Sequence, residues 1–390
     1  MWIKRALEAK LLRTAQAFPC LLVTGPRQAG KSSLLRHLFP EIPCLYLDDL
    51  PTLRLASEDP KGFLAQAGEP VILDEVQLVG NLFVCLKHLI DEDTSKKGRF
   101  LLTGSQVFEL MRGVSDSLPG RAAILELLPL SWAEIMGDSA SSPPEIRAVW
   151  HQMWRGFFPA VQALHQEEVY TWMSSYLMSV VSRDIRSLLA IEHLGRFQRF
   201  LELLALRAGQ VLNLSEVAKE AQVSHAAARD WISVLEATYM IKFLKPWHTN
   251  LSKRAVKSPK LLFVDTGLLC YLLNIRSSEE LRRHPLYGNL FENMVAMEMI
   301  KRLGSIGRER SLYYYRQDGG AELDLLIETA DGCWGYEVKS TATPSLDDRK
   351  HLIALQEELR IQKGQVLSLA EAPLGKGIMS HHFLNMELPS

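Results

Sequence analysis

The stretch GPRQAGKS, Gly25 to Ser32, decides the fold at the front of this 390-residue chain. It fits the pattern G-x-x-x-x-G-K-[ST], with a short apolar run before it and the helical sequence SSLLRHLF from Ser32 onward. Such glycines let backbone N–H groups curl around phosphate oxygens, and the dipole of the following helix adds positive potential. Lys31 is expected to reach the β- and γ-phosphates of ATP, and Ser32 to offer its hydroxyl to Mg²⁺. The predicted nucleotide-contacting residues are Gly25, Pro26, Arg27, Gln28, Ala29, Gly30, Lys31, Ser32 and Ser33.

Hydrolysis needs a second set of groups, and the stretch VILDEVQ, Val71 to Gln77, supplies it. A buried strand here ends in Asp74, the expected metal partner, and Glu75 follows as the residue that orients the attacking water. In FLLTGSQ, Ser105, or alternatively Thr103, is expected to contact the γ-phosphate at the same edge of the sheet. Two alternatives stay open: an accidental loop, and a site that binds nucleotide without hydrolysing it.

Apolar runs alternate with helical patterns over the first third of the chain. This alternation predicts an α/β domain with a parallel sheet, covering residues 1–138 and ending at the polar, Pro-containing stretch GDSASSPPE, Gly137 to Glu145. The predicted strands are Leu21–Thr24, Cys44–Leu47, Val71–Leu73, Phe100–Thr103 and Ala122–Leu127.

Arg121, in the stretch LPGRAAILELL, is a candidate arginine finger. It could meet the phosphates bound by its own subunit or by a neighbouring one, where an arginine stabilises transition-state charge. The alternative is a surface arginine at the start of a strand.

Composition narrows the class of protein and the choice of partners. A formal net charge of −1 excludes an overall field that attracts nucleic acid, so any such contact has to come from a local patch. The five cysteines contain no C-x-x-C pair, which indicates reduced thiols and not a zinc site. No apolar run reaches the roughly 18–20 residues of a membrane span, and the first residues lack the apolar core of a signal peptide. We therefore expect a cytoplasmic protein with no membrane contact.

The middle of the chain divides into a helical segment, 145–205, and a predicted winged helix-turn-helix, 206–275. Asn213 or Ser215 can cap the first helix of the turn and Ser224 the second. The second helix would expose few residues able to read bases, whereas the segment after it is rich in cations. The alternative is a winged helix that packs against the ATPase and never touches DNA. The exposed helix residues are His225, Arg229 and Asp230, and the wing residues are His248, Asn250, Lys253, Arg254, Lys257 and Lys260.

The last region, 286–390, places carboxylates on a predicted hairpin. Glu322 and Asp324 share one strand face, as do Glu337 and Lys339, because residues two apart point the same way. Pairing the two strands brings Asp324 beside Glu337 and Lys339, a set suited to Mg²⁺ or Mn²⁺ and to phosphodiester hydrolysis. Glu292 lies at the edge of the buried face of the preceding helix, where a charge is costly without a cation. The alternative is four solvated charges.

The quoted motifs resemble a known group over nearly the whole chain. GPRQAGKSSLL, VILDEVQ, LLTGSQ and LPGRAAILELLPLSWAE resemble bacterial and archaeal AAA-type ATPases that carry an uncharacterised C-terminal region. The later stretches resemble that region, and YYYRQDGGAELDLLIE with YEVKS is similar to the PD-(D/E)XK restriction-endonuclease-like superfamily. The resemblance implies metal-binding and catalytic roles for Glu292, Asp324, Glu337 and Lys339. Leu323, and not proline, precedes Asp324, which departs from the pattern in the superfamily's name.

The sequence thus predicts an α/β protein with three parts. These are an N-terminal parallel-sheet P-loop ATPase, a central helical and winged-helix region, and a C-terminal α/β restriction-endonuclease-like domain. We expect ATP and Mg²⁺ as cofactors, DNA as a partner through the winged helix and the C-terminal domain, and a homo-oligomer. The rival interpretation is a nucleotide-controlled regulatory or defence switch that binds a partner or DNA without cleaving it. A plain transcription regulator is disfavoured, because the recognition helix offers few base-reading side chains.

Overall fold

The computed structural model describes residues 2–105, 117–137, 143–181, 194–248, 258–308, 311–317, 320–373 and 378–389. Its contacts divide the chain into two compact units. The first is Met1–Leu130 with Ala237–Tyr239, and the second is Ser131–Glu236 with Met240–Ser390. None of the helices in these described ranges has the length and apolar character that a bilayer crossing requires.

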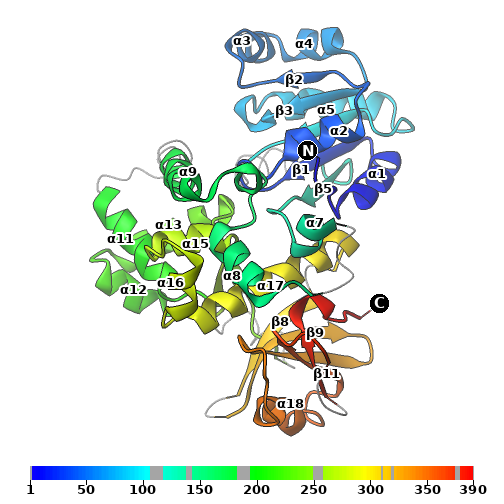
Figure 1. The fold of residues 1–390 in the computed structure, drawn as a ribbon. Helices are drawn as coiled ribbons and strands as arrows, with labels where there is room; N and C mark the ends of the chain where they lie inside the picture. The colour runs from blue at the N-terminus through cyan, green and yellow to red at the C-terminus, as the bar shows by residue number, and fades with distance from the viewer. Residues whose placement is uncertain are drawn as a thin grey trace. The chain divides into compact units, whose positions relative to one another are not determined.

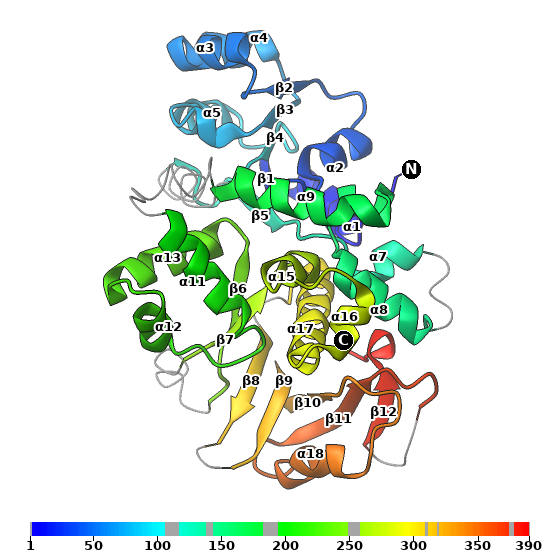
Figure 2. The ribbon, with the colours of Figure 1, turned by 60° about the vertical axis from the view of Figure 1, so that its left-hand side comes forward.

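The first unit is built on a five-stranded sheet in the order β2–β3–β4–β1–β5 (Figures 1 and 2). Every neighbouring pair runs parallel, as the alternating apolar runs predict. Strand β4 lies between β1 and β3, so the strand before the phosphate loop and the strand ending in Asp74 are next-nearest neighbours. The strands are β1 Cys20–Thr24, β2 Cys44–Tyr46, β3 Val71–Asp74, β4 Phe100–Thr103 and β5 Ala122–Glu126.

Helices cover both faces of this sheet, which is why β1, β3 and β4 are apolar on both sides. Leu22 and Leu73 face a core shared with α3, α4 and α5, whereas Leu21 and Ile72 face a core shared with α1 and α2. The polar residues after β1, β3 and β4 therefore meet at one edge, where the strands end. The helices are α1 Glu8–Ala17, α2 Lys31–Leu38, α3 Leu50–Glu58, α4 Pro60–Ala67 and α5 Leu82–Glu92.

The first unit ends at Leu130, before the boundary at 138 that the polar stretch suggests. The reason is helix α7, Trp132–Met136, which packs within the second unit. The Trp132 backbone N–H donates to Glu298 Oε2 at 2.9 Å, and its ring lies 5.9 Å from the ring of Phe383. A buried aromatic side chain thus decides where the short helix belongs.

The second unit begins with helices and a small sheet (Figure 2). Asn213 accepts a hydrogen bond from the Glu216 N–H, and Ser224 from the Ala227 N–H, so both cap as predicted. After the second capped helix, β6 pairs antiparallel with β7. The elements are α8 Ile146–Arg155, α9 Gln166–Ser179, α11 Leu194–Ala205, α12 Leu214–Glu220, α13 His225–Ala237, β6 Ile241–Leu244, β7 Lys260–Phe263, α15 Thr266–Leu272 and α16 Ser278–Arg283.

A mixed sheet in the order β12–β11–β10–β9–β8 completes the second unit. Strands β8, β9 and β10 are antiparallel neighbours, which confirms the predicted hairpin, whereas β11 and β12 add in parallel. Helices α17 and α18 lie on opposite sides of this sheet in both views (Figures 1 and 2). The elements are α17 Tyr287–Ile306, β8 Leu312–Arg316, β9 Glu322–Thr329, β10 Gly332–Val338, α18 Lys350–Ala354, β11 Ile361–Ser368 and β12 Met379–His382.

Candidate nucleotide site and acidic cluster

The phosphate loop connects β1 to α2 and depends on two glycine conformations. Gly25 has φ 142°, and a Cβ there would lie 2.1 Å from the Leu127 carbonyl oxygen, so no larger residue fits without moving the backbone. Gly30, with φ 94°, caps α2 in a left-handed conformation that favours glycine. The loop therefore presents backbone N–H groups at the N-terminus of α2, as the motif requires.

Lys31 and Ser32, the first residues of α2, contact different kinds of group: Lys31 binds backbone carbonyls and Ser32 binds a carboxylate. The buried Lys31 ammonium donates to the carbonyl oxygens of Gly25 at 3.0 Å and Pro26 at 2.9 Å. Ser32 Oγ lies 2.5 Å from Asp74 Oδ1, and the Thr103 hydroxyl donates to the same oxygen. A serine hydroxyl beside a carboxylate is a hard-oxygen pair that fits Mg²⁺. Ser32 and Asp74 are thus brought together as predicted, and Thr103 joins them.

Glu75 directly follows β3 and has a left-handed conformation, with φ 56°, that side-chain-bearing residues adopt rarely. Its Oε2 accepts hydrogen bonds from Gln77 Nε2 at 2.5 Å and from Ser105 Oγ at 3.1 Å. Burial acts to raise the pKa of Glu75, but the charges of Lys31 and Arg27 and these hydrogen bonds lower it overall. The carboxylate is therefore held in one orientation and kept ionised.

Two contributors to this site escape sequence reasoning. Gln77, two residues after Glu75, orients its carboxylate through a hydrogen bond. No sequence motif marks Gln77 for this role. Arg5, far from any motif, is only 5% exposed and donates to Ala29 O at 2.8 Å and to Leu128 O at 2.6 Å. It thereby ties the phosphate loop to the segment after β5. A lone arginine before an amphipathic helix carries no pattern from which this could be foreseen.

Arg121 lies at the opposite edge of the sheet from the phosphate loop. It directly precedes β5, whose first residue Ala122 pairs with Cys20 at the start of β1. Its guanidinium binds Asp91 through Nε at 2.5 Å and Nη2 at 3.0 Å. The expectation that it meets phosphates in its own subunit is therefore wrong, because a strand of five residues, about 16 Å, separates the two edges.

The carboxylates of the last region converge around a lysine. Lys260 Nζ lies 2.9 Å from Glu292 Oε1, 3.0 Å from Glu322 Oε1 and 3.7 Å from Asp324 Oδ1. We call Lys260 and these three carboxylates the acidic cluster. The prediction that Lys260 is an exposed wing cation is wrong, since only 3% of its surface is exposed. The wing residues Asn250, Lys253, Arg254 and Lys257 lie outside the described residues.

Glu337 and Lys339 lie beside the acidic cluster, as the hairpin pairing predicts. Lys339 Nζ is 2.9 Å from Glu337 Oε2, and the Val338 N–H donates to Asp324 Oδ2 at 2.8 Å. The other oxygen of Glu337, Oε1, is buried without a hydrogen bond, 3.5 Å from His351 Nδ1. Burial and the nearby Asp324 raise the pKa of Glu337 to about 8.

Lys260 supplies the buried positive charge of the acidic cluster, and Arg316 Nε lies 3.7 Å from Glu322 Oε2 at its exposed side. Burial and Asp324 raise the pKa of Glu292 to about 7, although Lys260 opposes this. Burial acts to lower the pKa of Lys260, but its three carboxylate partners raise it overall. A divalent cation does not fit among these oxygens while the ammonium lies there. Within the described ranges, no three His, Cys, Asp or Glu side chains form a group that could hold a metal ion.

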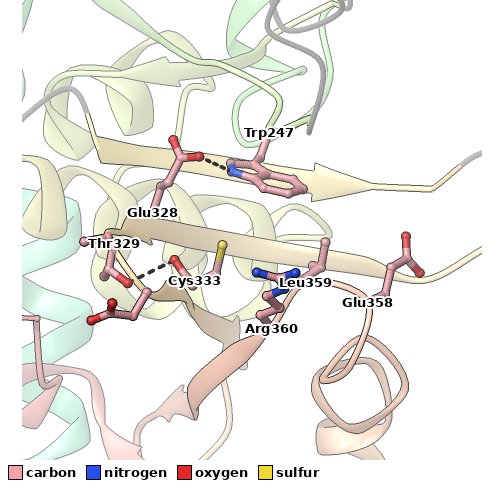
Figure 3. A pocket seen from close by; sticks show the side chains of 10 residues that line it. Trp247, Glu328, Thr329, Cys333, Glu358, Leu359 and Arg360 are labelled. Carbon is pink, nitrogen blue, oxygen red and sulfur yellow. Dashed lines mark hydrogen bonds between the residues drawn. The ribbon is translucent and has the colours of Figure 1, made fainter.

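A separate open cavity of about 630 Å³ lies at the turn of the β9–β10 hairpin (Figure 3). Trp247, Glu328 and Arg360 line it, together with the turn residues Thr329 to Cys333. Trp247 Nε1 donates to Glu328 Oε1 at 3.2 Å, and Glu358 Oε1 accepts from the Tyr315 hydroxyl at 2.7 Å. The Trp247 contact lies next to the hairpin turn, at the end of β9 opposite to Glu322 and Asp324.

The chain matches three families of domains. Residues 17–136 match an AAA domain, residues 146–279 a domain of unknown function (DUF8612), and residues 287–387 a domain of unknown function (DUF4143). A parallel sheet whose carboxyl edge carries a phosphate loop and two consecutive carboxylates, in a segment that matches an AAA domain, makes this chain a P-loop ATPase.

Relatives extend the similarity over most of the chain. Uncharacterized protein Rv2008c of Mycobacterium tuberculosis and Uncharacterized protein Mb2031c of Mycobacterium bovis are each 32% identical over 356 residues, 90% of this chain and 78% of the relative. The chain belongs to the family of these two proteins. Uncharacterized protein MJ1544 of Methanocaldococcus jannaschii is 20% identical over 351 residues, 83% of this chain and 75% of that protein. Among solved structures, the Walker-type ATPase PABY2304 of Pyrococcus abyssi is 15% identical with a TM-score of 0.47, covering 70% of this chain and 96% of that one.

Proposed function

We propose that the N-terminal unit binds ATP with Mg²⁺ and hydrolyses it, with Glu75 orienting the attacking water. The observation that carries this proposal is the convergence of Ser32, Asp74, Thr103 and Glu75 at one edge of the sheet. The two consecutive carboxylates there have separate partners. Asp74 accepts hydrogen bonds from the hydroxyls of Ser32 and Thr103, whereas Glu75 accepts them from Gln77 and Ser105.

The chain's own groups divide the work. Backbone N–H groups of residues 25–32 bind phosphate oxygens, and Lys31 leaves the carbonyls of Gly25 and Pro26 to meet the terminal phosphates. Ser32 and Asp74 would hold Mg²⁺, with Thr103 fixing the rotamer of Asp74. The metal, when bound, offsets negative charge on the phosphates. The lowered pKa of Glu75 keeps its carboxylate ready to accept a hydrogen bond from water at neutral pH.

Substitution of Glu75 and Lys31 tests this proposal. Glu75→Gln should retain ATP affinity and lower the hydrolysis rate about 10²–10⁴-fold, because it removes only the water-orienting charge. Lys31→Ala should abolish hydrolysis and weaken binding. Glu92→Gln, at an exposed position at the end of α5, is the matched control and should leave both unchanged. A full hydrolysis rate in Lys31→Ala would remove the phosphate-loop assignment.

A second candidate function is ATP-dependent action on DNA. His225 and Arg229 are exposed on α13, in the region that we propose to be a winged helix, and a cation-rich segment follows β6. Asp324, Glu337 and Lys339 lie together in the region that we propose to be restriction-endonuclease-like, and these residue types suit contact with a phosphodiester. The rival is a switch that binds DNA or another partner without cleaving it.

Cleavage assays separate these two candidates. Single-stranded, duplex and branched DNA would be incubated with Mg²⁺ or Mn²⁺, with and without ATP, for the wild type and Lys339→Ala. Cleavage that disappears in the variant supports a nuclease. Equal cleavage by both proteins, or none, favours the switch.

We also propose that the chain works as a homo-oligomer. Arg121 is partly exposed and faces away from its own phosphate loop, so a catalytic contact of this arginine has to be with a neighbour's nucleotide. Sedimentation with and without a non-hydrolysable ATP analogue tests the assembly, and a monomer under both conditions would contradict it.

A further inference from the structure

Lys260 holds its place through its backbone. It is the first residue of β7, pairs with Leu244 of β6 and forms a bridge with Val211. Its side chain leaves this small sheet and reaches Glu292 on α17 and Glu322 on β9. One ammonium therefore joins the strand of one region to two elements of the next.

We propose that Lys260 is the built-in counter-ion of the acidic cluster and that it and a divalent cation exclude each other there. This inference rests on the proposed restriction-endonuclease-like region, whose resemblance implies metal-binding roles for Glu292 and Asp324. It assigns to Lys260 control over that site: the carboxylates accept a metal only when the lysine side chain withdraws.

Geometry supports the exclusion. The ammonium is within hydrogen-bond distance of Glu292 Oε1 and Glu322 Oε1, at 2.9 and 3.0 Å, and is 3.7 Å from Asp324 Oδ1. A divalent cation needs carboxylate oxygens at about 2.0–2.6 Å, so it would compete for the same oxygens. Two cations that share such ligands would repel each other strongly in a buried site, where charges are poorly screened.

Burial explains why the cluster needs a cation. Lys260 is nearly inaccessible, and the side chain of Glu292 is only 18% exposed. Buried carboxylates without a positive partner are strongly destabilising, so the sequence has to provide one. The Tyr314 ring, 5.4 Å from Lys260 Nζ, closes another side of the ammonium. With the backbone of Lys260 paired to two segments, the rotamer of its side chain is the part that can change.

Manganese binding by the full-length chain, without nucleotide or DNA, tests the proposal. Lys260→Gln keeps a polar side chain but removes its charge, and should bind Mn²⁺ at least tenfold more tightly than the wild type in calorimetry. Adding Asp324→Asn to this variant should abolish the gain. Lys363→Gln, which removes a lysine paired with Glu387 in the same unit, is the matched control and should behave as the wild type. No gain in Lys260→Gln, or a gain that survives Asp324→Asn, would overturn the proposal.

If Lys260→Gln does not fold, the proposal can be tested on the wild type by chemical acetylation of lysines, measured by mass spectrometry. Without metal, Lys260 should resist acetylation. When Mn²⁺ binds in a way that depends on Asp324, as shown by its loss in Asp324→Asn, Lys260 should become reactive. The absence of Asp324-dependent Mn²⁺ binding at every concentration would overturn the proposal, because the carboxylates would then accept no metal. Asp324-dependent binding beside a still-resistant Lys260 would refute it.

These outcomes are separable from those of the cleavage assay. The binding measurements contain no DNA, so a chain that never cleaves leaves them valid. If the wild type cleaves DNA with metal while Lys260 stays resistant to acetylation, the inference about Lys260 is wrong and the nuclease proposal stands.

Discussion

Arg5 should contribute more to the phosphate loop than its distance from the motif suggests. The nearly buried guanidinium donates to Ala29 O at 2.8 Å and to Leu128 O at 2.6 Å. Hydrogen bonds from charged groups contribute about 1.5–3 kcal/mol each, so Arg5→Ala should lower local stability by about 3–6 kcal/mol. Arg5→Lys keeps the charge, but a single ammonium cannot donate to both carbonyl oxygens as the two guanidinium nitrogens do. About half of the loss in local stability should therefore remain.

Hydrogen exchange, measured by mass spectrometry on peptides covering residues 20–38, gives the free energy of local opening. An unfolding curve of the whole chain would not separate this local change from the unfolding of the two units. Affinity for a non-hydrolysable ATP analogue should fall in parallel, because Ala29 belongs to the loop. Arg13→Ala, an exposed arginine on α1, is the control. A change below about 1 kcal/mol in Arg5→Ala, with unchanged affinity, would refute the reasoning.

Three further predictions follow from single residues. Gly25→Ala should abolish ATP binding, measured by calorimetry, because its Cβ would lie 2.1 Å from the Leu127 carbonyl oxygen; wild-type affinity would contradict this. Arg121→Ala should leave the ATP affinity of its own subunit unchanged, since Arg121 lies at the far edge of the sheet, and a tenfold loss would count against that placement. Burial lowers the pKa of His382 from 6.5 to about 4, and its Nδ1 accepts a hydrogen bond from Leu384. The unfolded chain therefore takes up this proton first, and the free energy of unfolding should fall as the pH drops from 6.5 to 4, by up to about 3 kcal/mol. His382→Gln should flatten this limb in urea unfolding curves, and an unchanged slope would exclude the residue as its cause.

Local signals predicted much of the architecture. Strands β1 to β5 stand out because each is a short apolar run bounded by polar residues, and the alternation with helices implies parallel pairing. The starts of α12 and α13 follow from Asn213 and Ser224, whose caps act within three residues. The hairpin of β9 and β10 is equally local, and so Asp324 and Glu337 could be placed side by side.

Other features depend on partners far apart in the chain. The parallel additions of β11 and β12 join segments separated by a helix and long loops, and no periodicity marks which strand they choose. Trp132 takes α7 into the second unit through Glu298 and Phe383, although the nearest polar stretch suggests a boundary after it. Arg5 joins the loop for the same kind of reason: it satisfies carbonyls that only the folded chain brings near it.

By itself, the sequence predicted the nucleotide site, because a phosphate loop and a strand ending in Asp74 and followed by Glu75 are short motifs whose geometry is set by their own backbone. Only the tertiary structure decided the character of the acidic cluster. Lys260 looks like a surface cation among other cations when its neighbours in sequence are considered. In the fold it is the buried counter-charge of three carboxylates from two other elements, because desolvated charges have to be balanced in space and not along the chain.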